Sequence, residues 1–202
     1  MAVEGSIPFV HSIKEIMSFL TVLKPLKKGI PEGNSIFLAG PSFREPVPFC
    51  QTWRAEAIGW LNSHAYTGSV SVPEPFDPSG TFEDQVKWEE EHLEAATCIL
   101  FWVPRNLLRL PGFTTNVEFG EWMKSGKVVL GFPGNAQKMR YLEYKAKEYS
   151  IPVAHTLEET VDLALEYLQV RDEQCPQCGA YNPGKKRSKR SYDCMDCGFS
   201  RD

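Results

Sequence analysis

The sequence contains no apolar run close to about 20 residues long, the length that a helix needs to cross a bilayer. This absence excludes a transmembrane span. Its first residues, MAVEGSIPFVHSIKEIM, also lack the basic start, the apolar stretch and the small-residue cleavage site of a secretory signal. These absences predict a cytoplasmic protein with no membrane partner.

Several catalytic and nucleotide-binding motifs are missing as well. The sequence has neither GxGxxG nor a Walker motif, so it does not indicate a glycine-rich loop that binds a dinucleotide or a triphosphate. A serine nucleophile elbow and an HExxH helix are also absent. The 4 histidines lie on separate predicted elements without metal-like spacing, which favours structural or solvated roles for them.

The composition is that of a globular protein, but its charge is divided unevenly. Of 202 residues, 42% are hydrophobic and 24% charged, which argues against disorder. Residues 171–202 carry 7 basic and 5 acidic side chains, whereas residues 1–170 carry 15 and 21. We therefore expect a helical extension over 1–33, a main domain over 34–170 and a small separate domain over 171–202.

Four cysteines define that last domain. Cys175 and Cys178, and then Cys194 and Cys197, form two CxxC pairs, each followed by a glycine that permits a tight turn. Two such pairs supply the four thiolates of a structural zinc site, and four ligands leave no open position for catalysis. The alternative, two disulfides, is disfavoured in a cytosolic protein. The segment resembles a zinc ribbon.

Between the two CxxC pairs lies a basic segment, Asn182–Arg190, which is predicted to be a hairpin tip. It either offsets the charge of the thiolates as a solvated loop or contacts the phosphates of a nucleic acid. Tyr181, Tyr192 and Phe199 nearby can stack on bases or pack the small domain, and the sequence leaves both possibilities open.

The main domain alternates strands with helices. Strands are expected at 35–39, 69–73, 97–103, 127–132 and 151–154, and helices at 52–62, 83–95, 117–124, 137–149 and 157–170. The pattern predicts an α/β fold with a doubly wound (Rossmann-like or flavodoxin-like) five-stranded parallel sheet. Another helix is expected over His11–Lys24, with no strand before it.

In such sheets the ligand lies beyond the carboxyl ends of the strands. Gly40, directly after the first strand, lets a ligand approach the backbone, and Ser42 and Arg44 follow it as candidate binding residues. The alternative interpretation of this loop is a simple tight turn.

A long loop after the third strand leads into a helix that carries Glu118. A carboxylate near a helix N-terminus is held ionised and directed at the site. Alternatively, Glu118 pairs with Thr115 as a capping box. Gly120 is expected to let this helix press against a neighbouring element.

The order of elements over residues 34–168 and the motif from Thr115 to Gly120, TNVEFG, resemble those of the nucleoside 2-deoxyribosyltransferase family. The resemblance implies that Glu118 is the nucleophile that attacks the anomeric carbon and displaces the base. It assigns Glu89 to the substrate or the leaving base, although Glu89 can also be a solvent-facing helix charge.

The resemblance also suggests the residues around the substrate. The predicted binding residues besides those of the first loop are Phe37, Trp88, Trp102, Arg105, Thr115 and Asn116. The two tryptophans are aromatic walls or core residues. Arg105 and Arg109 are interpreted either as residues that bind a phosphate group or as surface charges. Two features depart from the family: Phe37 stands where a tyrosine is common, and an aspartate before the nucleophile is replaced by the segment Pro111–Phe113.

Two classes of function follow. The first is an enzyme that transfers or hydrolyses the N-glycosidic bond of a (deoxy)nucleoside or nucleotide, ribose compounds included. The second is a non-catalytic nucleotide-sensing module whose zinc ribbon binds nucleic acid or a protein partner. The resemblance further implies a homo-oligomer.

Overall fold

The computed structural model describes residues 20–25, 29–31, 33–45, 47–74 and 79–172, and three short strands at 186–188, 191–193 and 200–201. The four cysteines of the predicted zinc site lie outside the described residues, as does most of the predicted helix over His11–Lys24.

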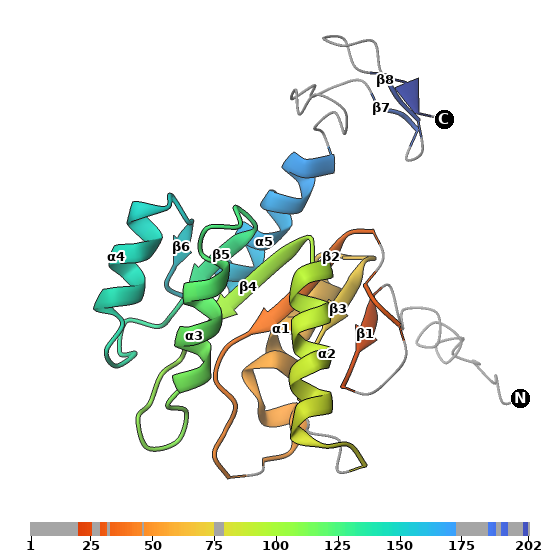
Figure 1. Cartoon of the computed structure of the whole chain (residues 1–202). Coiled ribbons are helices and arrows are strands. Elements are labelled where there is room, and N and C mark those ends of the chain that lie inside the picture. Colours follow the sequence, from red (N-terminus) through yellow and green to blue (C-terminus); the bar gives the residue numbers. More distant parts are fainter. Residues whose placement is uncertain are drawn as a thin grey trace, which may run out of the picture.

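The main body is built on one parallel sheet of six strands in the order β1-β3-β2-β4-β5-β6 (Figure 1). The strands are β1 (Thr21–Leu23), β2 (Ser35–Ala39), β3 (Ser69–Ser71), β4 (Cys98–Trp102), β5 (Val128–Gly131) and β6 (Val153–Ala154). All five predicted strands are confirmed, and without β1 their order is that of flavodoxin-like sheets. The predicted number of strands was wrong by one.

The additional strand, β1, lies where a helix was expected. Thr21 pairs with Ser69 and Leu23 with Ser71, so β1 extends the sheet at its β3 edge. Thr21 and Val22 are β-branched and suit a strand, but the partner that fixes them in the sheet lies about 48 positions away in the chain. The described part of the predicted helical extension therefore belongs to the main sheet.

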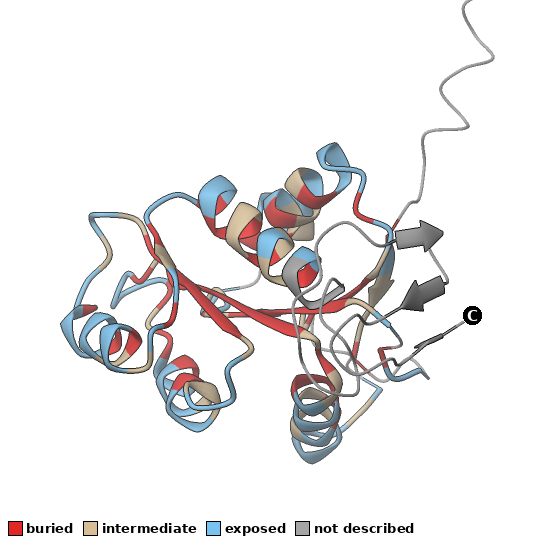
Figure 2. Cartoon of the chain, turned by 90° about the horizontal axis from the view of Figure 1, so that it is seen from above, coloured by how far each residue is buried: buried red, intermediate tan, exposed pale blue. Residues whose placement is uncertain are grey.

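Helices cover both faces of this sheet (Figure 2). One face is covered by α1 (Trp53–Ser63) and α5 (Leu157–Asp172), and the other by α2 (Phe82–Ala95), α3 (Phe113–Trp122) and α4 (Arg140–Glu148). A short 3₁₀ turn, η1 (Phe49–Gln51), precedes α1. None of the described helices is long and apolar enough to cross a membrane.

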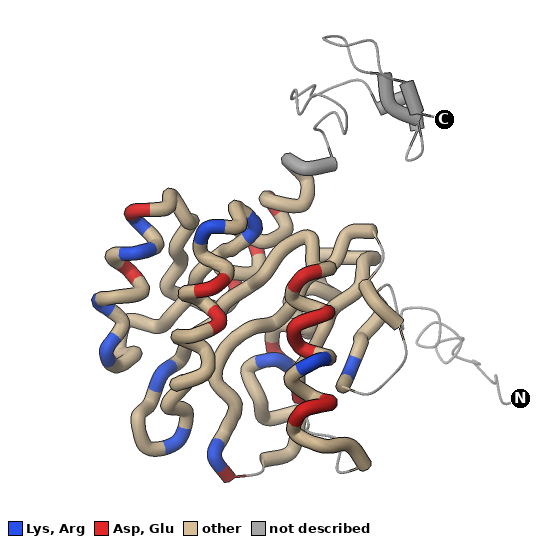
Figure 3. Tube along the Cα trace, in the orientation of Figure 1, with Lys and Arg blue, Asp and Glu red and all other residues tan. Residues whose placement is uncertain are grey.

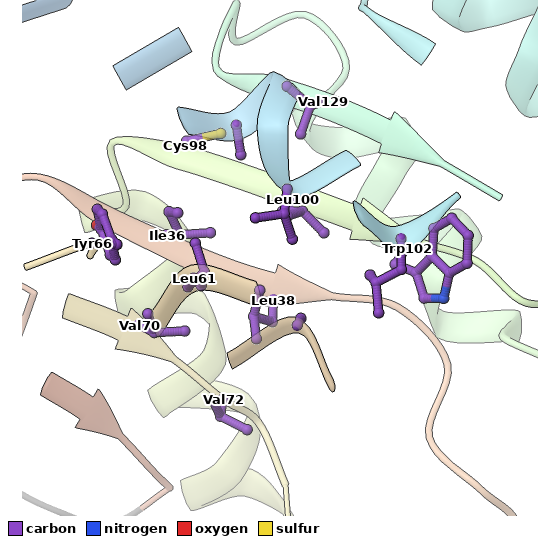
Figure 4. Packing of buried hydrophobic residues seen from close by; sticks show 14 of the residues in the cluster. Ile36, Leu38, Leu61, Tyr66, Val70, Val72, Cys98, Leu100, Trp102 and Val129 are labelled. Carbon is purple, nitrogen blue, oxygen red and sulfur yellow. The ribbon is translucent and has the colours of Figure 1, made fainter. Parts of the chain in front are cut away.

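Two hydrophobic clusters, one on each face, hold the helices to the sheet. Ile36, Leu38 and Leu100 point toward α1 and α5 in the first cluster (Figure 4), whereas Phe37 and Phe101 belong to the second. Because both faces are covered, every residue of β2 and β4 is buried, which explains their continuous apolar sequences. Cys98 lies in the core.

The described part of the tail is a three-stranded antiparallel sheet in the order β7-β8-β9. Its strands are β7 (Lys186–Ser188), β8 (Ser191–Asp193) and β9 (Ser200–Arg201). The predicted hairpin is present, but Lys186–Ser188 forms one of its strands instead of its tip.

Candidate functional site

The candidate site lies at the carboxyl edge of the sheet, around the end of β2. Strand order reverses there, because β2 has β3 on one side and β4 on the other. At such a switch point the loops that follow neighbouring strands separate and leave room for a ligand. The loops after β2 and β4 are joined by a backbone hydrogen bond, from Arg44 N–H to the Arg109 carbonyl at 3.1 Å.

A buried arginine holds the end of β2. Arg54 belongs to the first turn of α1, and only 1% of it is exposed. Its Nε donates to the Leu38 carbonyl at 3.0 Å, its Nη2 to the Gly40 carbonyl at 2.7 Å, and its Nη1 to Ser42 Oγ at 3.0 Å. The guanidinium thus comes from a helix on one face of the sheet and fixes the backbone at the sheet's carboxyl edge.

Arg54 also pairs with Glu74, which follows β3. Its Nη1 lies 2.9 Å from Glu74 Oε2, and the glutamate side chain is 12% exposed. The other carboxylate oxygen, Oε1, is buried and has no hydrogen-bond partner among the described residues. Glu74 Oε1 is therefore an acceptor that no described residue uses.

Two further carboxyl groups face this arginine from α2 and α3. Glu89 accepts a hydrogen bond from Gln85 Nε2 at 2.7 Å, and Gln85 Nε2 also donates to the Pro73 carbonyl at 3.2 Å. Glu89 and Glu118 are both half-buried, whereas Glu90 beside Glu89 is exposed. Figure 3 shows acidic residues on both helices. Glu89 is therefore not a fully solvent-facing helix charge.

The charges of these residues act on one another. Burial, followed by the charges of Glu89 and Glu121, raises the pKa of Glu118 to about 7 against the opposing charge of Arg54. Burial also raises the pKa of Glu89, against the hydrogen bond from Gln85 and the charge of Arg54. We call Arg54, Glu74, Glu89 and Glu118 the carboxylate cluster. One cation serves three carboxyl groups in this cluster, and Glu118 is the member whose pKa is raised to about 7.

The start of α3 excludes the capping-box interpretation of Glu118. The residue that precedes the helix is Gly112, with φ of 61°, and no side chain caps this end. Thr115 is buried inside the helix, so the carboxylate of Glu118 is not needed as its capping partner. The expectation for Gly120 was also wrong, because a Cβ atom there would meet nothing within 4 Å.

Gly40 has a packing reason for being glycine. Its φ is +148°, and a Cβ atom there would overlap the backbone oxygen of Trp102 and lie 2.9 Å from Trp53 Cζ2. The ends of β2 and β4 approach each other closely at this point. Of the other two residues predicted in this loop, Ser42 accepts a hydrogen bond from Arg54, and Arg44 is exposed.

The aromatic residues predicted around the substrate are core residues. Phe37, Trp88 and Trp102 are 2%, 6% and 6% exposed. The Trp88 ring stacks on His92 with centroids 3.9 Å apart, and His92 Nδ1 lies 2.8 Å from Ser71 Oγ, so this histidine has the predicted structural role. Trp88 Nε1 is buried without a hydrogen-bond partner among the described residues.

Arg105 and Asn116 lie away from the carboxylate cluster. An Arg105 Nη2 hydrogen bond joins the two residues, and the arginine also donates to the Gly112 carbonyl at 3.4 Å. Positions 116 and 118 of a helix point about 200° apart, so Arg105 lies on the other side of α3 from Glu118. Arg105 is 5% exposed, so it is not surface charge, whereas Arg109 is exposed.

The roles of Arg54 and Glu74 in this site were not predicted from the sequence. An arginine inside a helical segment usually predicts an exposed side chain, and no local pattern connects it to a glutamate 20 positions later. Among the described residues, no group of three or more His, Cys, Asp or Glu side chains is arranged to hold a metal ion.

A family model described as "Nucleoside 2-deoxyribosyltransferase like" matches residues 33–135. The match spans β2 to β5 and includes all four members of the carboxylate cluster. No curated protein matches the chain.

Proposed function

The chain belongs to the nucleoside 2-deoxyribosyltransferase-like family, and we propose that it transfers or hydrolyses the N-glycosidic bond of a (deoxy)nucleoside or nucleotide through Glu118. One observation carries the proposal. At the carboxyl edge of a parallel sheet, a half-buried Glu118 lies in the electrostatic reach of a second carboxyl group, Glu89, and of a buried arginine, Arg54.

The proposed reaction has two displacements at the anomeric carbon. A carboxylate oxygen of Glu118 forms a bond to this carbon, while the base leaves with the electron pair of the C–N bond. The negative charge of the carboxylate stabilises the oxocarbenium-like transition state. A second base, or water, then attacks the same carbon and releases Glu118 as a carboxylate. The Glu89 carboxylate accepts the proton of the attacking water or base in this second step.

Glu89 is the proposed proton carrier for the base. Burial raises its pKa, which favours the protonated form that can protonate a leaving nitrogen. Because the charge of Glu89 raises the pKa of Glu118, a single proton shared by the two groups is favoured. The productive state has this proton on Glu89 and the charge on Glu118.

Arg54 is proposed to position the cluster and not to touch the reacting atoms. Arg54 pairs with Oε2 of Glu74. Glu74 Oε1 and Gln85 Oε1 are both buried and have no hydrogen-bond partner among the described residues. Both atoms accept hydrogen bonds. Hydroxyl and amino groups of a nucleoside supply donors, which supports this substrate class.

The proposal is tested by mass spectrometry of the protein after incubation with a panel of nucleosides and nucleotides. We expect a glycosyl adduct on the peptide that contains Glu118, together with free base in solution. If prolonged incubation leaves both the protein and every ligand unchanged, the enzymatic proposal fails and the sensing module is favoured.

The pH dependence of base release offers a second prediction. Glu118 attacks only as the carboxylate and Glu89 donates only as the acid, so kcat/KM should rise with pH toward the pKa of Glu118, about 7, and fall again at higher pH as Glu89 loses its proton. The ionised Glu89 is one cause of that high pKa. In Glu89→Gln the midpoint of this rise should therefore move to lower pH, while the maximal rate falls with the loss of the proton carrier. A midpoint that stays in place or moves upward contradicts the assignment.

For the tail we propose one structural zinc ion held by Cys175, Cys178, Cys194 and Cys197. The purified protein should contain about one zinc per chain by emission spectroscopy, because four thiolates complete a tetrahedral site. Cys175→Ser should lose most of this zinc, whereas Cys50→Ser, at an exposed cysteine of the main domain, should keep it. Removal of zinc by a chelator should unfold the tail and leave base release intact. Full zinc content in Cys175→Ser contradicts the proposed ligands.

A further inference from the structure

A cavity of about 350 Å³ opens at the carboxyl ends of β4 and β5. No member of the carboxylate cluster lines it. The residues around it come from the loops after β2, β4 and β5: Phe43, Pro104, Arg105, Asn106, Arg109, Leu110, Pro133, Asn135 and Gln137.

Arg105 is a buried cation in the wall of this cavity. Its hydrogen bonds go to neutral oxygens, the carbonyls of Gly112 and Lys138 and Oδ1 of Asn116. Its Nε is buried without a partner among the described residues. Burial lowers the pKa of Arg105, and no carboxylate charge opposes this effect. A buried charge without a counter-ion is costly, which favours an anion as the missing partner.

The rest of the lining suits an anion. It contains a second guanidinium, that of Arg109, 5.6 Å from the Phe43 ring, and no Asp or Glu. Asn106 Oδ1 accepts hydrogen bonds from the N–H groups of Leu108 and Arg109, and Gln137 Oε1 accepts one from Leu107 N–H. Both amides thus use their oxygens internally and keep NH₂ groups, which are donors, for a ligand.

The cavity also has apolar walls, formed by Phe43, Pro104, Leu110 and Pro133. Its volume is at the lower end of the range of small-molecule sites, which begins at about 300 Å³, and exceeds the space that a bare oxyanion fills. Two guanidinium groups match the two negative charges of a phosphomonoester, and the apolar walls can cover its carbon body.

We propose that this cavity is a binding site for a small organic phosphate, separate from the carboxylate cluster. The separation follows from α3, because Asn116, which bonds Arg105, and Glu118 point to different sides of this helix. The proposal does not depend on Glu118 being a nucleophile. The site remains if the chain has no enzymatic activity.

The test is calorimetric titration of the full chain with a nucleoside 5′-monophosphate, the matching nucleoside and inorganic phosphate. The monophosphate should bind at least about tenfold more tightly than either of the others, since only it offers both the charge and a carbon body. Arg109→Ala, a change at an exposed side chain, and Arg105→Gln should each weaken it by about tenfold or more. Arg140→Ala, at an exposed arginine on α4 outside this cavity, is the matched control.

The Glu118→Gln variant separates this site from the proposed active site. Binding of the monophosphate that depends on Arg109 and persists in Glu118→Gln supports a separate site. The proposal is overturned if the monophosphate binds no better than the nucleoside, if Arg109→Ala binds it as tightly as Arg140→Ala, or if Glu118→Gln abolishes the binding. Because Arg109→Ala is a surface change, the result stands even if Arg105→Gln does not fold.

Discussion

Replacement of Glu118 by Gln should lower kcat/KM for base release by at least about 10³-fold, the scale of loss when a nucleophile is removed. The amide has nearly the same shape as the carboxylate, but it carries no charge and attacks the anomeric carbon poorly. Chromatographic measurement of free base, from whichever nucleoside or nucleotide proves to be the substrate, gives the rate. Glu143→Gln, at an exposed glutamate on α4, is the control and should stay close to the original rate.

A separate measurement shows that the loss is not caused by unfolding. The folded-state pKa of Glu118 is raised, so its contribution to stability is present below about pH 4.5 and is lost as pH rises through about 7. The Glu118→Gln variant has no ionisable group at this position, so it does not lose this stability as the pH rises. At pH 8 the variant should therefore unfold with a free energy higher by up to about 3 kcal/mol. An inactive variant that is also less stable at pH 8 would contradict our view of the site.

Among the single substitutions described here, Arg54→Met should lose the most stability, with a free energy of unfolding lower by about 3–5 kcal/mol. Methionine fills similar space but leaves the charge of Glu74 without its partner, and three oxygens at the end of β2 lose their donor. Denaturant unfolding at neutral pH measures the change.

Two matched variants define the cause of that loss. Arg44→Met removes an exposed arginine from the loop after β2 and should change stability by less than about 0.5 kcal/mol. In the double variant Arg54→Met/Glu74→Met no buried charge is left unpaired, so it should recover part of the stability lost in the single variant. If Arg54→Met is no less stable than Arg44→Met, the ion pair has no structural role.

The arrangement of the main sheet was largely predictable, because continuous apolar strands and amphipathic helices alternate along the sequence. Ser35–Ala39 was predicted with its observed bounds, since both faces of that strand are covered. Strand β1 was not predictable, because three half-exposed residues become a strand only through their pairing with β3. The start of α3 was placed four residues late, because Gly112 begins the helix through its backbone conformation and without a capping side chain.

The candidate site was predictable only in part. Glu118 follows from its place in the helix after a strand-end loop and from the family resemblance, whereas Glu89 follows from the resemblance alone. The charge of Glu89 acts on Glu118 in the structure. The roles of Arg54 and Glu74 depend on contacts across the sheet edge between distant segments, which periodicity does not encode. Trp88 and Trp102 illustrate the reverse problem, because a tryptophan near a site suits both a ligand wall and a core.

The attachment of Arg54 to β2 has an evolutionary consequence. The same guanidinium holds the backbone at Leu38 and Gly40 and balances the charge of Glu74, so a mutation there affects folding and chemistry together. A lineage could exchange the exposed Arg44 in the neighbouring loop without any other change. Divergence at position 54 would instead require Glu74 to change in the same step, so we expect these two positions to covary among descendants of a common ancestor.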